Sequence, residues 1–162
     1  MHLSAAEGWL GLGNIVEANT ELEQIAAGQR AHPNVLEIRW QIYAKQKHWE
    51  ACVDIARSIT KLVPGQAKGW IHLAFATRQV KNGGLEAALA VLVPVVDHFP
   101  KNPLICFYLA GYTAQLNQLL ESTRWWDKAM EIAGRTGQLN KIRMMALDDP
   151  DLEPLLKGIG KA

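Results

Sequence analysis

The sequence predicts an all-α protein made of four similar helix-turn-helix units of about 35 residues, followed by a short helical tail. Three observations lead to this prediction. A triplet of a bulky apolar residue, an acid and a small residue recurs four times along the 162 residues. Glycine, asparagine and proline recur between amphipathic segments, where helices end and begin. No segment shows the sustained alternation of apolar and polar residues that predicts a strand.

The recurring triplets mark the second helix of each unit. They are Val16-Glu17-Ala18, Trp49-Glu50-Ala51, Leu85-Glu86-Ala87 and Leu120-Glu121-Ser122. Their small residues are separated by 33, 36 and 35 positions. A large apolar side chain follows each small residue by one helical turn, so both lie on one face. These side chains are Leu22, Ile55, Val91 and Trp126.

Turn-forming residues separate the two helices of each unit. They are Gly13-Asn14, Gln46-Lys47-His48, Asn82-Gly83-Gly84 and Asn117-Gln118. Gln46-Lys47-His48 is the weak member, because Gly and Asn tolerate the left-handed conformation of a helix end better than other residues. Prolines mark the outer boundaries at Pro33, Pro64, Pro100 and Pro103. The predicted units cover residues 3–32, 33–64, 66–100 and 102–135.

Pro94 and the tail depart from the repeat. Pro94 falls inside a predicted helix, where it removes a backbone hydrogen bond and is expected to kink the chain after Ala90. In the tail, 138–162, we expect one helix over Asn140–Leu147 and a second over Asp151–Lys157. The last unit of a repeat array needs a covering element. We assign this cap to Ile142, Met145, Leu152, Leu155 and Leu156.

The four units resemble tetratricopeptide repeats. That repeat has a Leu-Gly or Leu-Ala pair in its first helix, a small residue early in its second and a proline at its end. Leu73-Ala74 and Leu109-Ala110 match the pair, and the four small residues and the terminal prolines match the rest. The resemblance covers about 130 residues. It implies a right-handed α-solenoid of about four repeats with a C-terminal capping helix segment, forming one domain over residues 1–162.

The second unit departs from the family pattern, because Ile38-Arg39 places a long cation where the repeat has Gly or Ala, which is expected to splay its helices. A narrower resemblance comes from three runs. HPNVLEIRWQIYAKQKHWEAC, GWIHLAFA and MALDDPDLEPL are similar to a group of small bacterial tetratricopeptide-repeat proteins with no assigned activity.

Composition limits the partners and the location. There are 17 Lys and Arg against 16 Asp and Glu, which gives little support for a nucleic-acid or anionic-membrane partner. The most apolar run, Leu85–Val96, is too short and too interrupted to span a membrane. Cys52 and Cys106 cannot form a disulfide framework, and Met1-His2-Leu3-Ser4 lacks the features of a signal peptide. We expect a cytoplasmic protein. The short first helix leaves open whether Met1 is the natural start.

We expect no enzyme, and therefore no catalytic residue, metal or cofactor. The histidines show no pairing at metal-ligand spacing, and the two cysteines have no CxxC partner. No serine lies in a G-x-S-x-G turn. The glycines of 8–13 lack the context of a phosphate-binding loop. The acids of 148–153 lack the ligand spacing of a calcium-binding loop.

In tetratricopeptide arrays the first helices line a concave groove, as the resemblance implies. Transfer of the groove positions predicts a peptide-binding set of Trp40, Tyr43, Lys47, His72, Phe75, Arg78, Gln79, Tyr108 and Gln115. Further groove positions are Glu37, Lys68, Phe107 and Gly111. We expect Trp40, Tyr43, Phe75, Arg78 and Tyr108 to carry most of the binding. Periodicity alone is equally compatible with Trp40 and Phe75 in the core.

The charge distribution favours an acidic or C-terminal carboxylate ligand. Residues 1–35 carry one base and four acids, 36–101 carry nine bases and five acids, and 102–162 carry seven of each. An excess this small is also typical of a solvated surface. The carboxylate clamp of chaperone-tail adaptors is not matched, because its asparagines correspond here to Trp40 and Phe75.

The sequence therefore predicts a protein-protein interaction module, or adaptor, that binds a peptide segment of a partner protein. Two alternatives stay open. Some tetratricopeptide proteins are secretion-type chaperones, which hold a partner protein until its delivery. In the second alternative, the chain is a structural subunit that self-associates through an exposed solenoid end near Leu3–Leu12.

Overall fold

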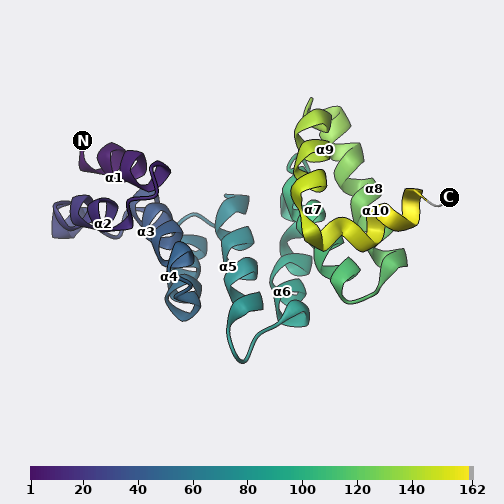
Figure 1. The fold of residues 1–162 in the computed structure, drawn as a ribbon, viewed down its shortest axis with the longest axis horizontal. Helices are drawn as coiled ribbons and strands as arrows, with labels where there is room; N and C mark the ends of the chain where they lie inside the picture. Colours follow the sequence, from purple (N-terminus) through teal and green to yellow (C-terminus); the bar gives the residue numbers. More distant parts are fainter. Residues whose placement is uncertain (161–162) are drawn as a thin grey trace. The chain divides into compact units, whose positions relative to one another are not determined.

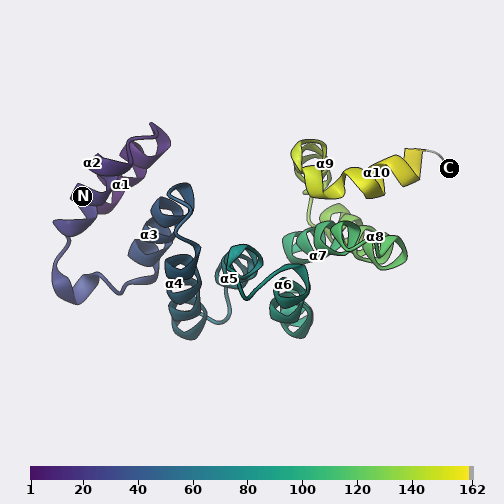
Figure 2. The same ribbon diagram turned by 60° about the horizontal axis from the view of Figure 1, so that its bottom comes forward.

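The computed structural model describes residues 1–160, and its regular structure is entirely helical over that range. The all-α prediction is confirmed. The chain divides into two compact units, Met1–Val80 and the residues from Lys81 onward (Figures 1 and 2). The expectation of one domain with four repeats stays a prediction.

The N-terminal unit consists of consecutive helices joined by short turns. They are α1 (His2–Gly11), α2 (Ile15–Glu23), the 3-10 turn η1 (Ala27–Gln29), α3 (Pro33–Lys45), α4 (Trp49–Leu62) and α5 (Ala67–Gln79). Helix α1 packs against α2 and α3, and α4 packs against α3 and α5. One apolar core joins α1, α2 and α3, and a second joins α3, α4 and α5.

The α1–α2 and α3–α4 turns share one backbone geometry. Gly13 and Lys47 both have a positive φ, of 78° and 58°. The following amide of each turn donates to a carbonyl one turn back, Asn14 to Trp9 and His48 to Tyr43, at 2.9 Å in both cases. This is the Schellman arrangement, which tolerates a non-glycine residue at a cost of about 1 kcal/mol. Lys47 therefore lies in the turn predicted over Gln46-Lys47-His48, and not on the first helix to which the groove positions of the family resemblance assign it.

Arg39 has an ionic partner on the preceding helix pair. Its guanidinium lies 3.3 Å from the Glu23 carboxylate at the end of α2. Arg30 pairs with the same carboxylate at 3.7 Å and donates to the carbonyl oxygens of Ile25 and Glu23. The Arg39 side chain thus links α3 to the end of α2, and the expected splaying of the helices in its unit stays a prediction.

Gly69 allows α5 to approach α4 closely. A Cβ added at Gly69 would lie 2.8 Å from Cγ2 of Ile59, whereas a Cβ added at Gly8 of α1 would meet nothing within 4 Å. We expect Gly69→Ala to lower the free energy of unfolding by about 1 kcal/mol, because overpacking exceeds the gain in helix propensity. Gly8→Ala is expected to raise it by about 0.5–1 kcal/mol. Urea unfolding curves check both, and equal signs for the two variants would contradict this packing.

The C-terminal unit begins with a helix that changes type at a proline. Its elements are α6 (Leu85–Leu92), the 3-10 helix η2 (Val93–His98), α7 (Pro103–Gln115), α8 (Leu119–Arg135), α9 (Leu139–Asp148), η3 (Pro150–Leu152) and α10 (Glu153–Gly160). Helix α6 ends two residues before Pro94, and the chain continues as the tighter 3-10 helix. This is the disturbance expected of a proline that removes a backbone donor.

The tail packs against α7, which is buried along most of its length. Of the five cap residues, Ile142, Leu152 and Leu155 are buried, and Met145 and Leu156 are half-buried. Asp149 accepts a hydrogen bond from the Asp151 amide at 2.9 Å and so starts η3 after α9. On the other side of α7, the Ser122 hydroxyl donates to the Ala110 carbonyl at 2.7 Å.

Candidate functional site

A polar bridge joins α3 to α5 in the N-terminal unit. Nε2 of His72 lies 2.8 Å from both carboxylate oxygens of Glu37. Nζ of Lys68 lies 3.1 Å from the same carboxylate, and the Gln41 amide donates to it at 3.0 Å. The Glu37 and His72 side chains are only 16% and 14% exposed. Glu37 and His72, which lie 35 positions apart on two helices, thus belong to one connected group of hydrogen-bonded side chains.

The bridge keeps the Glu37 carboxylate ionised. Burial by itself would raise the pKa of Glu37, but hydrogen bonding and charge from His72, with further hydrogen bonds from Gln41 and Lys68, lower it to about 2. Hydrogen bonds to the charged form favour that form. At neutral pH the carboxylate is therefore a fixed negative charge between the two helices.

Trp40 stacks on the bridge and belongs to the core. Its ring lies 3.8 Å from the His72 ring at an interplanar angle of 16°, and Phe75 contacts it edge-on at 6.2 Å. The sequence is compatible with Trp40 in the groove or in the core. Trp40 is 7% exposed in the structure and therefore belongs to the core. Phe75 is half-buried and contacts Trp49 from the other side. The Trp40 Nε1 is buried without a hydrogen-bond partner among the described residues.

A hollow of about 370 Å³ lies beside the bridge, between α1 and α3. Leu10 and Ile38, both buried, contribute its apolar lining. Glu7 contributes from α1 and Lys45 from α3, and both side chains are exposed with no ionic partner among residues 1–160. Gln41 also lines the hollow and connects it to Glu37.

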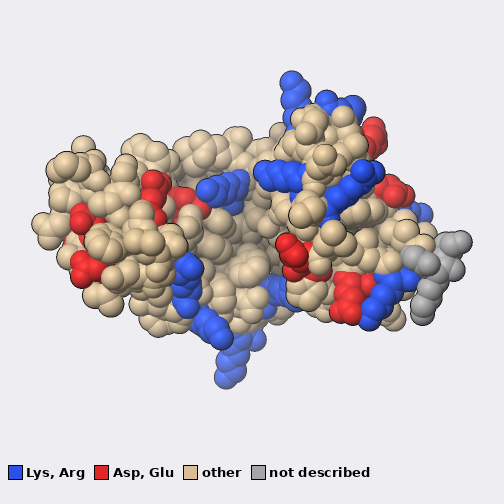
Figure 3. All heavy atoms as spheres, turned by 45° about the horizontal axis from the view of Figure 1, so that its top comes forward, with Lys and Arg blue, Asp and Glu red and all other residues tan. Residues whose placement is uncertain are grey.

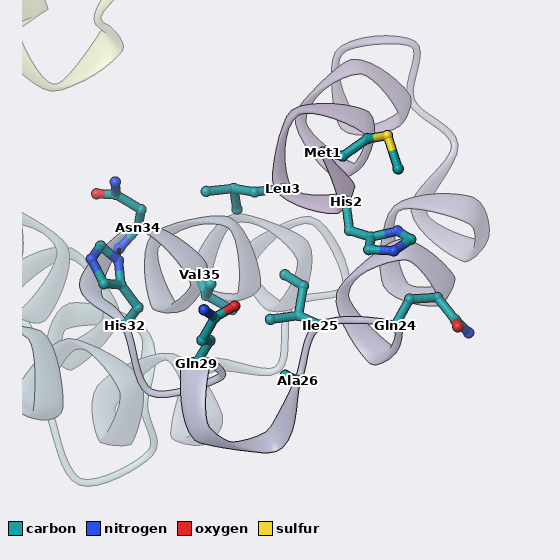
Figure 4. A pocket seen from close by; sticks show the side chains of 10 residues that line it. All are labelled: Met1, His2, Leu3, Gln24, Ile25, Ala26, Gln29, His32, Asn34 and Val35. Carbon is teal, nitrogen blue, oxygen red and sulfur yellow. Dashed lines mark hydrogen bonds between the residues drawn. The ribbon is translucent and has the colours of Figure 1, made fainter.

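Another hollow, of about 320 Å³, lies at the N-terminal ends of the same two helices (Figure 4). The apolar side chains of Leu3, Ile25 and Val35 are directed toward its centre. The amides and imidazoles around them belong to His2, Gln24, Gln29, His32 and Asn34. Nδ1 of His2 lies 2.8 Å from a carboxylate oxygen of Glu21.

The remaining predicted residues of the N-terminal unit lie near the C-terminal ends of α3 and α5. Tyr43 is half-buried, with its ring 5.9 Å from His48. Gln79 is exposed and Arg78 is half-buried. Lys47 is exposed in the turn after α3. The structure therefore brings Trp40, His72 and Phe75 together, while these four lie outside the polar bridge.

On α7, the tail contacts two of the predicted groove positions, Gly111 and Gln115. The Gln115 amide donates to the Asp151 carbonyl at 3.0 Å, and a Cβ at Gly111 would lie 3.2 Å from Cβ of Asp151. Phe107 is buried, which corrects its assignment to an open groove. Tyr108 is half-buried, and burial together with the charge of Asp149 raises its pKa. Within the described part of the C-terminal unit, this stretch of α7 serves to hold the tail.

Three residues of the α1–α3 hollow were missed by the sequence analysis. They are Glu7, Gln41 and Lys45. Gln41 and Lys45 follow Glu37 at intervals of four, which is the spacing of one helical face. That spacing could have placed them together, but no sequence signal shows that Glu7 lies opposite. Figure 3 shows acidic side chains over the α1–α2 end of the N-terminal unit, which carries Glu7, Glu17, Glu21 and Glu23.

Other chemical features of the described residues are limited. Burial raises the pKa of the Cys52 and Cys106 thiols to about 11, so both are protonated at neutral pH. Among residues 1–160, no three His, Cys, Asp or Glu side chains are grouped so that they could hold a metal ion. Over the same range, no helix has the length and apolar character needed to cross a membrane.

No protein-family model matches the chain, and a search of curated proteins finds no significant similarity.

Proposed function

We propose that the chain is a tetratricopeptide-type interaction module that binds a peptide segment of a partner protein on the face lined by α1, α3 and α5. In this proposal α1, α3 and α5 are first helices of successive repeats in an α-solenoid, and the protein is an adaptor without catalytic activity. The observation that carries it is the polar bridge of Glu37, His72 and Lys68 beside the hollow between α1 and α3.

The bridge gives this face the rigidity that peptide recognition requires. Glu37 is held by three side chains from two helices, so α3 and α5 present their outer residues in a fixed arrangement. A preorganised surface loses less conformational entropy when a ligand binds. Lys45 is exposed at this face without an ionic partner among the described residues and is available to a carboxylate of the ligand. Lys68 is also exposed, and its pairing with Glu37 holds it at the same face.

The proposal predicts which substitutions abolish partner capture. The double variant Lys45→Glu/Lys68→Glu reverses two exposed charges on α3 and α5. Its matched control, Arg57→Glu/Lys61→Glu, makes the same change on exposed positions of α4. In affinity capture from the source lysate with identification by mass spectrometry, we expect proteins retained by the wild type and the control to be lost with the first variant.

The control is expected to keep the unfolding transition of the wild type, because Arg57 and Lys61 are exposed. Lys68→Glu places a second carboxylate beside Glu37, so the first variant is expected to unfold at a lower urea concentration, and capture is carried out at a temperature at which circular dichroism shows all three chains to be folded. An identical set of captured proteins for all three would refute the assignment of binding to α3 and α5.

A further inference from the structure

The two hollows of the N-terminal unit lie along one seam between α1 and α3. On α3, Asn34 lines the hollow of about 320 Å³, called the first hollow from here on, and Ile38, Gln41 and Lys45 line the hollow of about 370 Å³, called the second. These positions are three or four residues apart and therefore form one stripe of the helix. On α1, Leu3 lines the first hollow and Glu7, Leu10 and Gly11 line the second. The two stripes face each other in parallel register.

The length of the seam defines the length of ligand that it accommodates. Asn34 to Lys45 spans eleven helical steps, or about 16 Å at 1.5 Å per residue. An extended peptide advances about 3.3 Å per residue, so about five residues cover the distance. A compact side chain or a small ion would fill only one of the two hollows.

The chemistry of the seam changes from one end to the other. The first hollow has an apolar centre surrounded by amides, including Gln29 and Asn34. Amide side chains both donate and accept, as a peptide backbone requires. The second hollow carries Glu7 on one wall and Lys45 on the other, neither with an ionic partner among the described residues.

We propose that this seam binds an extended peptide of about five residues that has an apolar side chain at one end and adjacent basic and acidic side chains at the other. The apolar side chain occupies the hollow of Leu3, Ile25 and Val35. Successive side chains of an extended peptide point to opposite sides. The basic one therefore contacts Glu7 while its acidic neighbour contacts Lys45. This inference rests on the proposed function and specifies its ligand.

The charges of the ligand are tested with a random-sequence peptide library selected on the immobilised full chain. We expect the wild type to enrich peptides with an apolar residue and an adjacent base and acid in a fixed order. The variant Glu7→Lys/Lys45→Glu is expected to enrich the opposite order. A wild-type peptide is expected to bind this variant about tenfold more weakly in fluorescence anisotropy, and exchange of its two charges is expected to restore the affinity.

A steric test uses two glycines of α1. Gly11 lines the second hollow and Gly8 does not, and a Cβ at either would meet nothing within 4 Å. Gly11→Phe is expected to abolish binding of the selected peptide, whereas Gly8→Phe adds the same bulk to the same helix and is expected to leave affinity within about twofold.

The possible results separate the ligand assignment from the proposed function. If the selected peptides bind the wild type, the charge-reversed variant and Gly11→Phe with equal affinity, the seam is not their binding site. Peptide binding itself, and so the proposed function, would not be refuted by that result. A library from which nothing is enriched would overturn both. If the library enriches sequences that occur in this chain itself, the ligand would be a second copy of the chain and not a partner protein. That result would overturn the proposal.

Discussion

Trp40→Ala is expected to lower the free energy of unfolding by about 3 kcal/mol, at the lower end of the range for a buried tryptophan. The substitution removes the stack on His72 and the edge contact with Phe75, and it leaves a cavity between α3 and α5. Part of the loss is offset, because the buried Nε1 has no hydrogen-bond partner among the described residues. Urea unfolding followed by circular dichroism measures the change.

Trp9→Ala is the matched control, because Trp9 is 37% exposed at the end of α1. A loss below about 1 kcal/mol is expected there. A loss below about 1 kcal/mol for Trp40→Ala as well would contradict the core position of Trp40, and would favour the exposed groove position that the family resemblance implies.

Glu37→Gln is expected to lower the free energy of unfolding by about 2 kcal/mol at neutral pH, and by less as the pH falls. The pKa of Glu37 is about 2 in the folded chain, against 4.5 for an unperturbed glutamate. A lowered pKa in the folded state means that the carboxylate stabilises the fold fully above the unfolded value. This contribution is lost as the pH falls through the folded value.

The difference between wild type and Glu37→Gln is therefore expected to shrink by more than half between about pH 6 and pH 3. Urea unfolding at several pH values measures it. Glu50→Gln on α4 is the control, since Glu50 is exposed, and it is expected to follow the wild type throughout. A difference for Glu37→Gln that does not vary with pH would contradict the ionic role of the bridge.

The helices could be predicted from the sequence because their signals are local. The glycine and asparagine turns, the prolines at Pro33 and Pro103 and the break at Pro94 act within one or two helical turns of the backbone. Lys47 shows the limit of this reasoning. Its left-handed conformation is imposed by the two hydrogen-bonded helices around it, which overrides its own preference.

The candidate site could be predicted only in part, because it depends on which side chains meet. The family resemblance places Glu37, Lys68 and His72 among the groove positions, but no local signal shows that they form one hydrogen-bonded group or that Trp40 stacks on His72. On α7, the sequence predicts both an open groove and a cap. It does not show that the cap covers the groove positions, through Asp151 against Gly111 and Gln115.

The most direct test of the central claim is an NMR titration of the isotope-labelled full chain with a peptide selected on it. If the face of α1, α3 and α5 binds peptides, the largest amide shift changes are expected along α1 and α3 and around His72 of α5. The outer residues of α2 and α4 are expected to change little. Changes concentrated on α2 and α4, with α1, α3 and α5 unaffected, would contradict the account.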